Sequence, residues 1–259
     1  MASELIRKQT PEERELAKKR KELADLEARL LQRELELSTL QAELQAFEAR
    51  YIRVVGTRYA ELDEIEARIA EAEARNRPHD QEAQHKAAEA RERWKESARA
   101  TEDAFARDQK PFVPTDDLRA LFREVVKRLH LDLTTDEHER ARRHVLMTQA
   151  NLAYAEGDIA KLRELLRDAE LNPDAVVGDG PGVELVRVIR KIAQVEERLE
   201  RIDAEIEALK KSNLWELRAK AEVAEKEGKD LLAEMAASIG ARIANARERL
   251  NRVMSQSMP

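Results

Sequence analysis

The chain has 259 residues, of which 39% are charged and only 3% are aromatic, and its formal net charge is −6. This composition is typical of long helices and coiled coils. Because both signs of charge are interleaved, we expect a solvated helical surface and no nucleic-acid binding. The lack of Cys excludes a disulfide framework, a thiol nucleophile and a zinc finger. No signal-peptide pattern and no long apolar run occur, so we expect a cytoplasmic protein without membrane contact.

The first helix is expected to begin at Thr10, where Thr10-Pro11-Glu12-Glu13 is a strong start signal. Apolar residues then recur in two rows at the spacing of a coiled-coil heptad. The first row is Leu23, Leu30, Leu37, Leu44 and Tyr51, and the second is Leu26, Arg33, Leu40, Phe47 and Val54, so that Arg33 interrupts it. After Tyr51 the first row resumes at Val55, and this four-residue step is a stutter in the heptad repeat. We expect the helix to continue to about Arg75.

A second helix is expected after a break at Asn76-Arg77-Pro78-His79-Asp80. One face of it consists of Ala83, Ala87, Ala90, Trp94 and Ala98; its small residues allow a close antiparallel approach to the first helix, and Trp94 is expected to lock the register. Residues 1–110 are therefore expected to form a coiled-coil hairpin. The row between Leu23 and Leu44 then needs another partner, which is either the C-terminal helices or a second copy of the chain.

The middle of the chain, residues 111–171, has the mixed composition of a small globular unit. A helix is expected to begin after Pro114, with Thr115 or Asp116 as its N-cap. One side of this helix is apolar and the opposite side is basic. The apolar stripe is Leu118, Phe122, Val125 and Leu129, and the basic face is Arg119, Arg123, Lys127 and Arg128.

The next helix is expected from Thr134, because Thr134 and Glu137 fit a capping box. Its apolar set is Val145, Met147, Ala150, Ala153 and Tyr154. The turn His130-Leu131-Asp132-Leu133 allows the two helices to run antiparallel. By residue type alone this is a polar turn, in which Asp132 satisfies the N-terminus of the following helix.

The segment from Thr115 to Leu166 resembles a J-domain, the co-chaperone module of DnaJ-like proteins. The matching residues are Leu118, Phe122, Val126, Leu129, His130, Asp132, Arg143, Met147, Asn151, Ala153, Tyr154, Gly157, Asp158 and Leu162. Together with the apolar stripe, the resemblance implies a core of Leu118, Phe122, Val125, Leu129, Met147, Asn151, Ala153 and Tyr154.

A J-domain docks on a DnaK-type chaperone ATPase through its basic helix and a His-Pro-Asp turn, and it promotes ATP hydrolysis there. The resemblance therefore implies a partner-binding surface of Arg119, Arg123, Lys127, Arg128, His130, Leu131 and Asp132. Leu131 stands at the position of the family's proline. Because proline fixes φ at about −65° and leucine does not, the turn is expected to be more mobile than in the family.

The C-terminal part begins with residues 172–182, which contain the glycine-rich run Gly178-Asp179-Gly180-Pro181-Gly182. No strand precedes these glycines and no Lys-Ser or Lys-Thr follows them, so a linker is expected and not a phosphate-binding loop. Residues 183–259 are expected to form a second antiparallel hairpin, with one helix from Val183 to Ser212 and another from Leu214 to Val253.

The sequence predicts neither a metal site nor an active site. None of the five histidines has another at the i, i+4 spacing of a helical metal pair, and no serine lies on a glycine-flanked elbow. We therefore expect no enzyme, no metal and no cofactor.

The predicted fold is all-α: elongated coiled-coil hairpins that flank a small J-domain-like unit. Two functions fit this prediction. In the first, the protein is a co-chaperone or adaptor that brings a DnaK-type ATPase to a client or complex subunit held by the coiled coils. In the second, it is a structural scaffold or assembly subunit whose J-like unit does not stimulate an ATPase.

Overall fold

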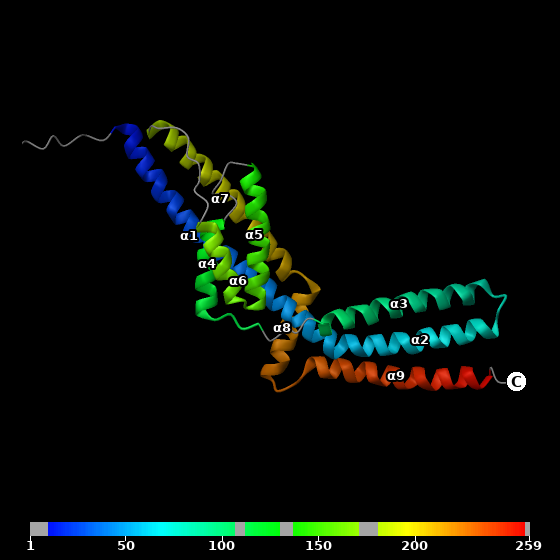
Figure 1. Cartoon of the computed structure of the whole chain (residues 1–259). Helices are drawn as coiled ribbons and strands as arrows, with labels where there is room; N and C mark the ends of the chain where they lie inside the picture. The colour runs from blue at the N-terminus through cyan, green and yellow to red at the C-terminus, as the bar shows by residue number, and fades with distance from the viewer. Residues whose placement is uncertain (1–9, 107–111, 130–136, 171–180, 257–259) are drawn as a thin grey trace, which may run out of the picture. The chain divides into compact units, whose positions relative to one another are not determined.

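The computed structural model describes residues 10–106, 112–129, 137–170 and 181–256, and the regular structure in these ranges is entirely helical (Figure 1). The predicted all-α class is confirmed. The chain forms two compact units, and each unit is built from two separate pieces of sequence. Residues 1–43 and 112–211 form the first unit, and residues 44–111 and 212–259 form the second.

This division differs from the four consecutive segments expected over 1–110, 111–171, 172–182 and 183–259. The helix α1 (Pro11–Tyr51) contributes residues to both units, and so does the C-terminal part of the chain. Helices that are distant in sequence pack together because each of them has an apolar row to bury. Sequence proximity therefore does not determine which helices share a unit.

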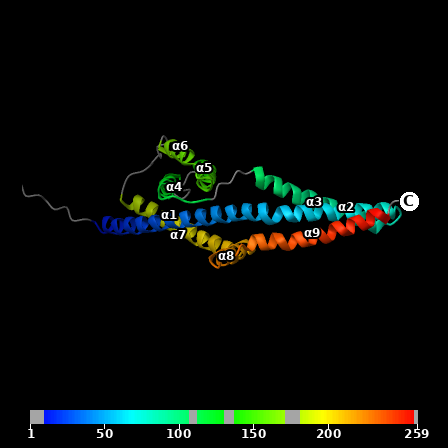
Figure 2. The same ribbon diagram turned by 90° about the horizontal axis from the view of Figure 1, so that it is seen from below.

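In the first unit, α1 lies beside α7 (Pro181–Lys210), and the two helices run parallel (Figure 1, Figure 2). Arg20 pairs with Glu184, and Glu34 pairs with Arg198, so the residue numbers increase in the same direction along both helices. Each helix has a row of buried apolar residues. On α1 the row is Leu16, Leu23, Leu30 and Leu37, and on α7 it is Val188, Ile192, Val195, Leu199, Ile202 and Ile206. Of the two partners considered for the leucine row, the C-terminal part of the chain thus provides one.

The first unit also contains α4 (Asp116–Leu129), α5 (Glu137–Glu156) and α6 (Ile159–Glu170). Local signals determine where α5 ends and α6 begins. Gly157 has a φ of 70°, a left-handed conformation, and the Asp158 N–H donates to the carbonyl of Ala153 at 2.8 Å. This is the Schellman pattern of a helix C-terminus. Asp158 then caps α6, because its Oδ1 accepts from the Lys161 N–H at 2.9 Å.

In the second unit, a π-helix (Ile52–Gly56) precedes α2 (Thr57–Asn76). It lies where the four-residue step from Tyr51 to Val55 interrupts the heptad repeat. A π-helical turn takes up additional residues, so the apolar row can continue on the same side of the helix. Val55, the residue at which the row resumes, is fully buried.

Two helices pack along α2. One of them is α3 (Gln81–Ala106), which runs antiparallel: Arg93 bonds Asp63 at 3.1 Å and Glu66 at 2.6 Å. The other is α9 (Leu231–Gln256), which runs parallel to α2, as Figure 1 and Figure 2 both show. The core of this unit gathers Phe47, Val55, Leu62, Ile65, Ile69, Ala221, Leu232, Ile239, Ile243 and Leu250.

The prediction of a single helix from Leu214 to Val253 is wrong, because the chain forms two helices there, α8 (Asn213–Lys226) and α9. Gly228 has a φ of 76°, and the Lys229 N–H donates to the carbonyl of Ala224 at 2.9 Å, which ends α8 in a second Schellman pattern. Asp230 then caps α9 through the Ala233 N–H. In addition, α7 belongs to the first unit and α9 to the second, so the C-terminal helices are not grouped as the expected hairpin.

The parallel packing of α1 and α7 leads to a stability prediction. Leu30 and Leu37 are each only 3% exposed, and a buried Leu→Ala change costs about 2–5 kcal/mol. We expect Leu30→Ala with Leu37→Ala to lower the free energy of unfolding by several kcal/mol, measured by urea titration with circular dichroism. The matched control replaces the exposed Gln32 and Gln41 of the same helix by Ala. An equal midpoint for both variants would show that the leucine row is not a packed interface.

Candidate partner-binding surface

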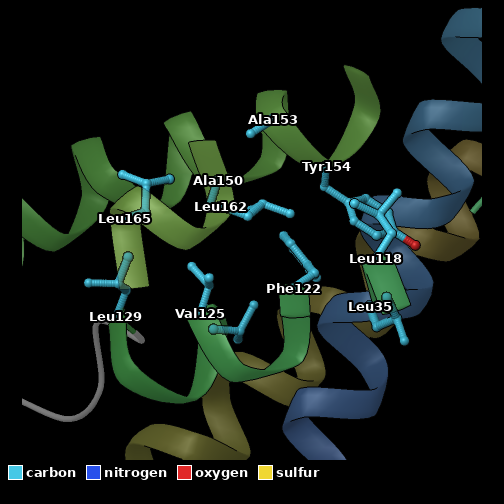
Figure 3. Close-up of a cluster of buried hydrophobic side chains, with 11 residues drawn as sticks. Leu35, Leu118, Phe122, Val125, Leu129, Ala150, Ala153, Tyr154, Leu162 and Leu165 are labelled. Carbon is cyan, nitrogen blue, oxygen red and sulfur yellow. The ribbon is translucent and has the colours of Figure 1, made fainter. Parts of the chain in front are cut away.

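The core of the α4–α6 region is built around two aromatic rings. Phe122 of α4 and Tyr154 of α5 are fully buried, and their ring centroids lie 4.5 Å apart (Figure 3). The surrounding buried residues come from all three helices and from α1: Leu35, Leu118, Val125, Val126, Leu129, Ala150, Ala153, Leu162 and Leu165. Stacked or tilted rings contribute about 0.5–1.5 kcal/mol beyond their buried area. The region thus has a core centred on two aromatic rings, which distinguishes it from the leucine row between α1 and α7.

Helix α1 completes this core from outside the segment that resembles a J-domain. Leu35 of α1 joins the apolar cluster beside Leu118 (Figure 3). The Tyr154 hydroxyl shares a hydrogen bond of 2.9 Å with the Thr39 hydroxyl, and Ser38 Oγ donates to Asn151 Oδ1 at 3.3 Å. The Tyr154 hydroxyl, which would otherwise be buried without a partner, is therefore satisfied by α1.

The chain just before α4 also covers Tyr154. The ring of Phe112 meets the Tyr154 ring edge-on, at a centroid distance of 5.4 Å. Phe112 is half-buried against the same apolar cluster. The α4–α6 region is consequently closed by residues that precede it in the sequence, on α1 and just before α4, and it is not a self-contained three-helix domain.

The expected core residues take the following places. Leu118, Phe122, Val125, Leu129, Ala153 and Tyr154 are buried, and Met147 and Asn151 are half-buried. Val145, which was expected on the apolar side of α5, is 56% exposed. It lies nine residues before Tyr154, and at 3.6 residues per turn this separation places the two side chains on opposite sides of the helix.

The basic residues of α4 lie outside the core because the apolar stripe of the helix is buried in it. Thr115 Oγ1 accepts from the Leu118 N–H at 3.2 Å, which caps the start of the helix. The apolar stripe then faces the cluster around Phe122. The opposite side carries the basic surface, defined here as Arg119, Arg123, Lys127 and Arg128.

Two residues of the basic surface are paired within α4. Arg119 Nη1 lies 3.2 Å from Asp116 Oδ1, and Arg128 Nη2 lies 3.3 Å from Glu124 Oε1. Exposed pairs of this kind are worth little and exchange readily for another partner. Arg123 and Lys127 are exposed and form no ion pair with other described residues. They are the cations most available to an acidic partner.

The turn that the resemblance singles out, His130-Leu131-Asp132, lies outside the described residues, as does Thr134 of the expected capping box. Leu129, the last residue of α4, is buried in the cluster. The turn therefore follows directly, in sequence, on the end of the helix that carries the basic surface.

Within the described residues, no group of His, Asp and Glu side chains is arranged to hold a metal ion. The described helices also include none whose length and apolar character would suffice to cross a membrane.

Comparison with known proteins adds no relative. No protein-family model matches the chain, and no curated protein and no solved structure matches it either.

A double-mutant cycle measures how much the hydrogen bond between Tyr154 and Thr39 of α1 contributes to the free energy of unfolding. We expect Tyr154→Phe and Thr39→Ala each to lower the free energy of unfolding, and the pair to show a coupling of about 0.5–1.5 kcal/mol, the net worth of one hydrogen bond. The control is Tyr59→Phe, because Tyr59 is partly exposed on α2 and should change little. Fully additive effects of Tyr154→Phe and Thr39→Ala would contradict the contact.

Proposed function

We propose that this protein is a J-domain-like adaptor that recruits a DnaK-type chaperone ATPase to a client or complex subunit held by its other helices. The observation that carries the proposal is the division of α4 into two sides. Phe122, Val125 and Val126 are fully buried on one side, while Arg123 and Lys127 are exposed on the other. A rigid helix that presents cations in this way is suited to docking on an acidic protein surface.

Recognition through exposed cations has a physical signature. The attraction between exposed charges is screened beyond about 10 Å at 0.1 M salt, so the association should weaken as salt is added. The resemblance adds the turn to this surface, with Asp132 as its critical polar group and His130 beside it. Leu131 makes the turn less rigid than a proline would, and weak stimulation of the ATPase is expected for this reason.

A second function, that of a scaffold or assembly subunit without ATPase stimulation, is favoured by a different observation. Leu35, Ser38 and Thr39 of α1 are built into the core or hydrogen bonds of the α4–α6 region. This integration suits a unit that serves mainly to hold a helical assembly together. Under this proposal the basic surface is an ordinary solvated helix face.

Single-turnover ATP hydrolysis by the cognate DnaK-type chaperone separates the two proposals. We expect weak stimulation by the wild type, no stimulation by Asp132→Asn, and higher stimulation with Leu131→Pro, because a proline at this position makes the turn more rigid. If all three proteins leave the rate at its basal value, co-chaperone activity is absent and the scaffold proposal stands.

The basic surface is tested by binding. Arg123→Glu should weaken association with the chaperone several-fold at low salt and leave the thermal unfolding of the protein unchanged, because Arg123 is exposed. Arg163→Glu, the same charge reversal at an exposed position of α6, serves as the matched control. Equal affinities for the two variants would rule out docking through α4.

A further inference from the structure

The packed seam between α1 and α7 contains a charged layer, formed by Arg33 and Glu34 of α1 and by Arg198 and Asp203 of α7. Glu34 is only 4% exposed, and both of its carboxylate oxygens accept from Arg198: Oε1 from Nε at 2.7 Å and Oε2 from Nη2 at 3.0 Å. Beside this pair, Arg33 Nε donates to Asp203 Oδ1 at 2.7 Å. The one residue that interrupts the apolar row of α1 therefore finds its counter-charge on α7.

The buried carboxylate of Glu34 requires a compensating cation. A carboxylate removed from water is costly unless a cation with good geometry compensates it, and the two parallel bonds from Arg198 provide such compensation. Burial by itself lowers the pKa of Arg198, but the hydrogen bonds and charges of Glu34 and Glu205 together outweigh this effect and raise the pKa above its ordinary value. Any helix that replaced α7 beside α1 would have to supply a cation for Glu34, and it would leave Arg33 with only Glu36 of its own helix unless it also carried an anion in the place of Asp203.

The layer also agrees with the register of the two helices. The pairs Arg20–Glu184 and Glu34–Arg198 lie two heptads apart on both helices, so one parallel register accounts for both. Each pair joins the residue just before a row position on α7 to the residue just after the following row position on α1. This register places Leu30 of α1 at the level of Leu199 of α7, and both side chains are buried.

The leucine rows of α1 would also suit a second copy of α1. In a parallel pair of identical helices, each row residue meets its own counterpart. Arg33 would then face Arg33 of the other chain, and each would keep Glu36 of its own helix as a counter-charge but lose Asp203. Like charges in a packed seam are strongly unfavourable, and this repulsion discriminates against the wrong partner.

We propose that the charged layer selects α7 of the same chain as the partner of α1 and prevents the leucine rows of α1 from pairing with those of a second chain. The selection has two parts: the attraction of Glu34 for Arg198 and of Arg33 for Asp203, and the repulsion between two copies of Arg33. The inference concerns chain pairing alone and does not depend on a chaperone partner.

Cysteine cross-linking of the full chain tests this selection, because the protein has no Cys of its own. Leu30→Cys with Leu199→Cys places one thiol on each helix at the level that the register assigns to both residues, and a disulfide requires a Cα separation of about 4.4–6.8 Å. Oxidation then gives a disulfide within one chain if α1 pairs with α7, and one between two chains if α1 pairs with α1. A denaturing, non-reducing gel distinguishes the two products.

Two substitutions in this background separate attraction from repulsion. Arg198→Glu opposes Glu34 with a second carboxylate, and Arg33→Leu removes the like charge that opposes self-pairing. We expect Arg33→Leu alone to keep the intrachain disulfide, and Arg198→Glu alone to lower its yield without giving dimers. Only the two together should produce interchain dimers, severalfold above the background level. Adding Glu34→Arg to Arg198→Glu should restore the intrachain disulfide.

The matched control replaces Arg33→Leu by Arg29→Leu, which adds the same side chain at an exposed position of α1, and should give no dimers. Intrachain disulfide at the parental yield in the chain with Arg33→Leu and Arg198→Glu overturns the proposal. So do equally abundant dimers with Arg198→Glu alone or with the Arg29→Leu control. Loss of both disulfides in the combined variant overturns it as well, because the layer would then only hold the fold together.

Discussion

The first unit depends on the burial of two sides of one helix. Helix α1 packs its leucine row against α7, and it turns Leu35 toward the cluster around Phe122 and Tyr154. Each fully buried leucine contributes about 1.5–3 kcal/mol relative to an exposed one. A single long helix with apolar residues on two sides is not stable alone in water, so both α7 and the α4–α6 region are needed to cover it. The position of α4, and with it the direction of its basic surface, follows from this requirement.

Polar groups in these interfaces contribute mainly to specificity. Replacing a buried ion pair by apolar residues of similar volume is often neutral or stabilising, whereas removing one partner is strongly unfavourable. The Glu34–Arg198 pair therefore does more to exclude wrong neighbours of α1 than to strengthen the right one. The hydrogen bonds of Ser38 and Thr39 to α5 act in the same direction, because only one rotation of α5 lets Asn151 and Tyr154 reach them.

The second unit shows how an irregular repeat is accommodated without breaking a helix. The heptad row would leave its side of the helix after Tyr51, and the π-helix at Ile52–Gly56 returns Val55 to the core. Gly56 is suited to this place, since a Cβ there would lie 3.1 Å from Ile52 Cγ2. Two other helices, α5 and α8, end at glycines with positive φ, Gly157 and Gly228, where a residue with a side chain would be strained.

The sequence by itself determined the features that depend on neighbouring residues. Helical periodicity indicated the apolar stripe of α4 with its basic opposite side, the break at 76–80 was evident from Pro78, and the stutter marked the place of the π-helix. The end of α8 had an equally local signal in Gly228 and Asp230, which the periodicity of the surrounding apolar residues obscured. The exposure of Val145 also follows from helix geometry, once Tyr154 is taken as the centre of the buried side. The turn at His130-Leu131-Asp132 remains a prediction from resemblance.

Only the tertiary structure decided which helices pack together. The leucine row of α1 is compatible with many partners, because apolar contacts are not directional. The choice of α7 rests on Glu34 and Arg198, which are 164 residues apart in sequence and whose pairing no local pattern reveals. For the same reason the sequence did not show that α1 would close the core around Tyr154. Leu35 and Thr39 reach this core only because α1 is buried on a second side, in addition to the side that faces α7.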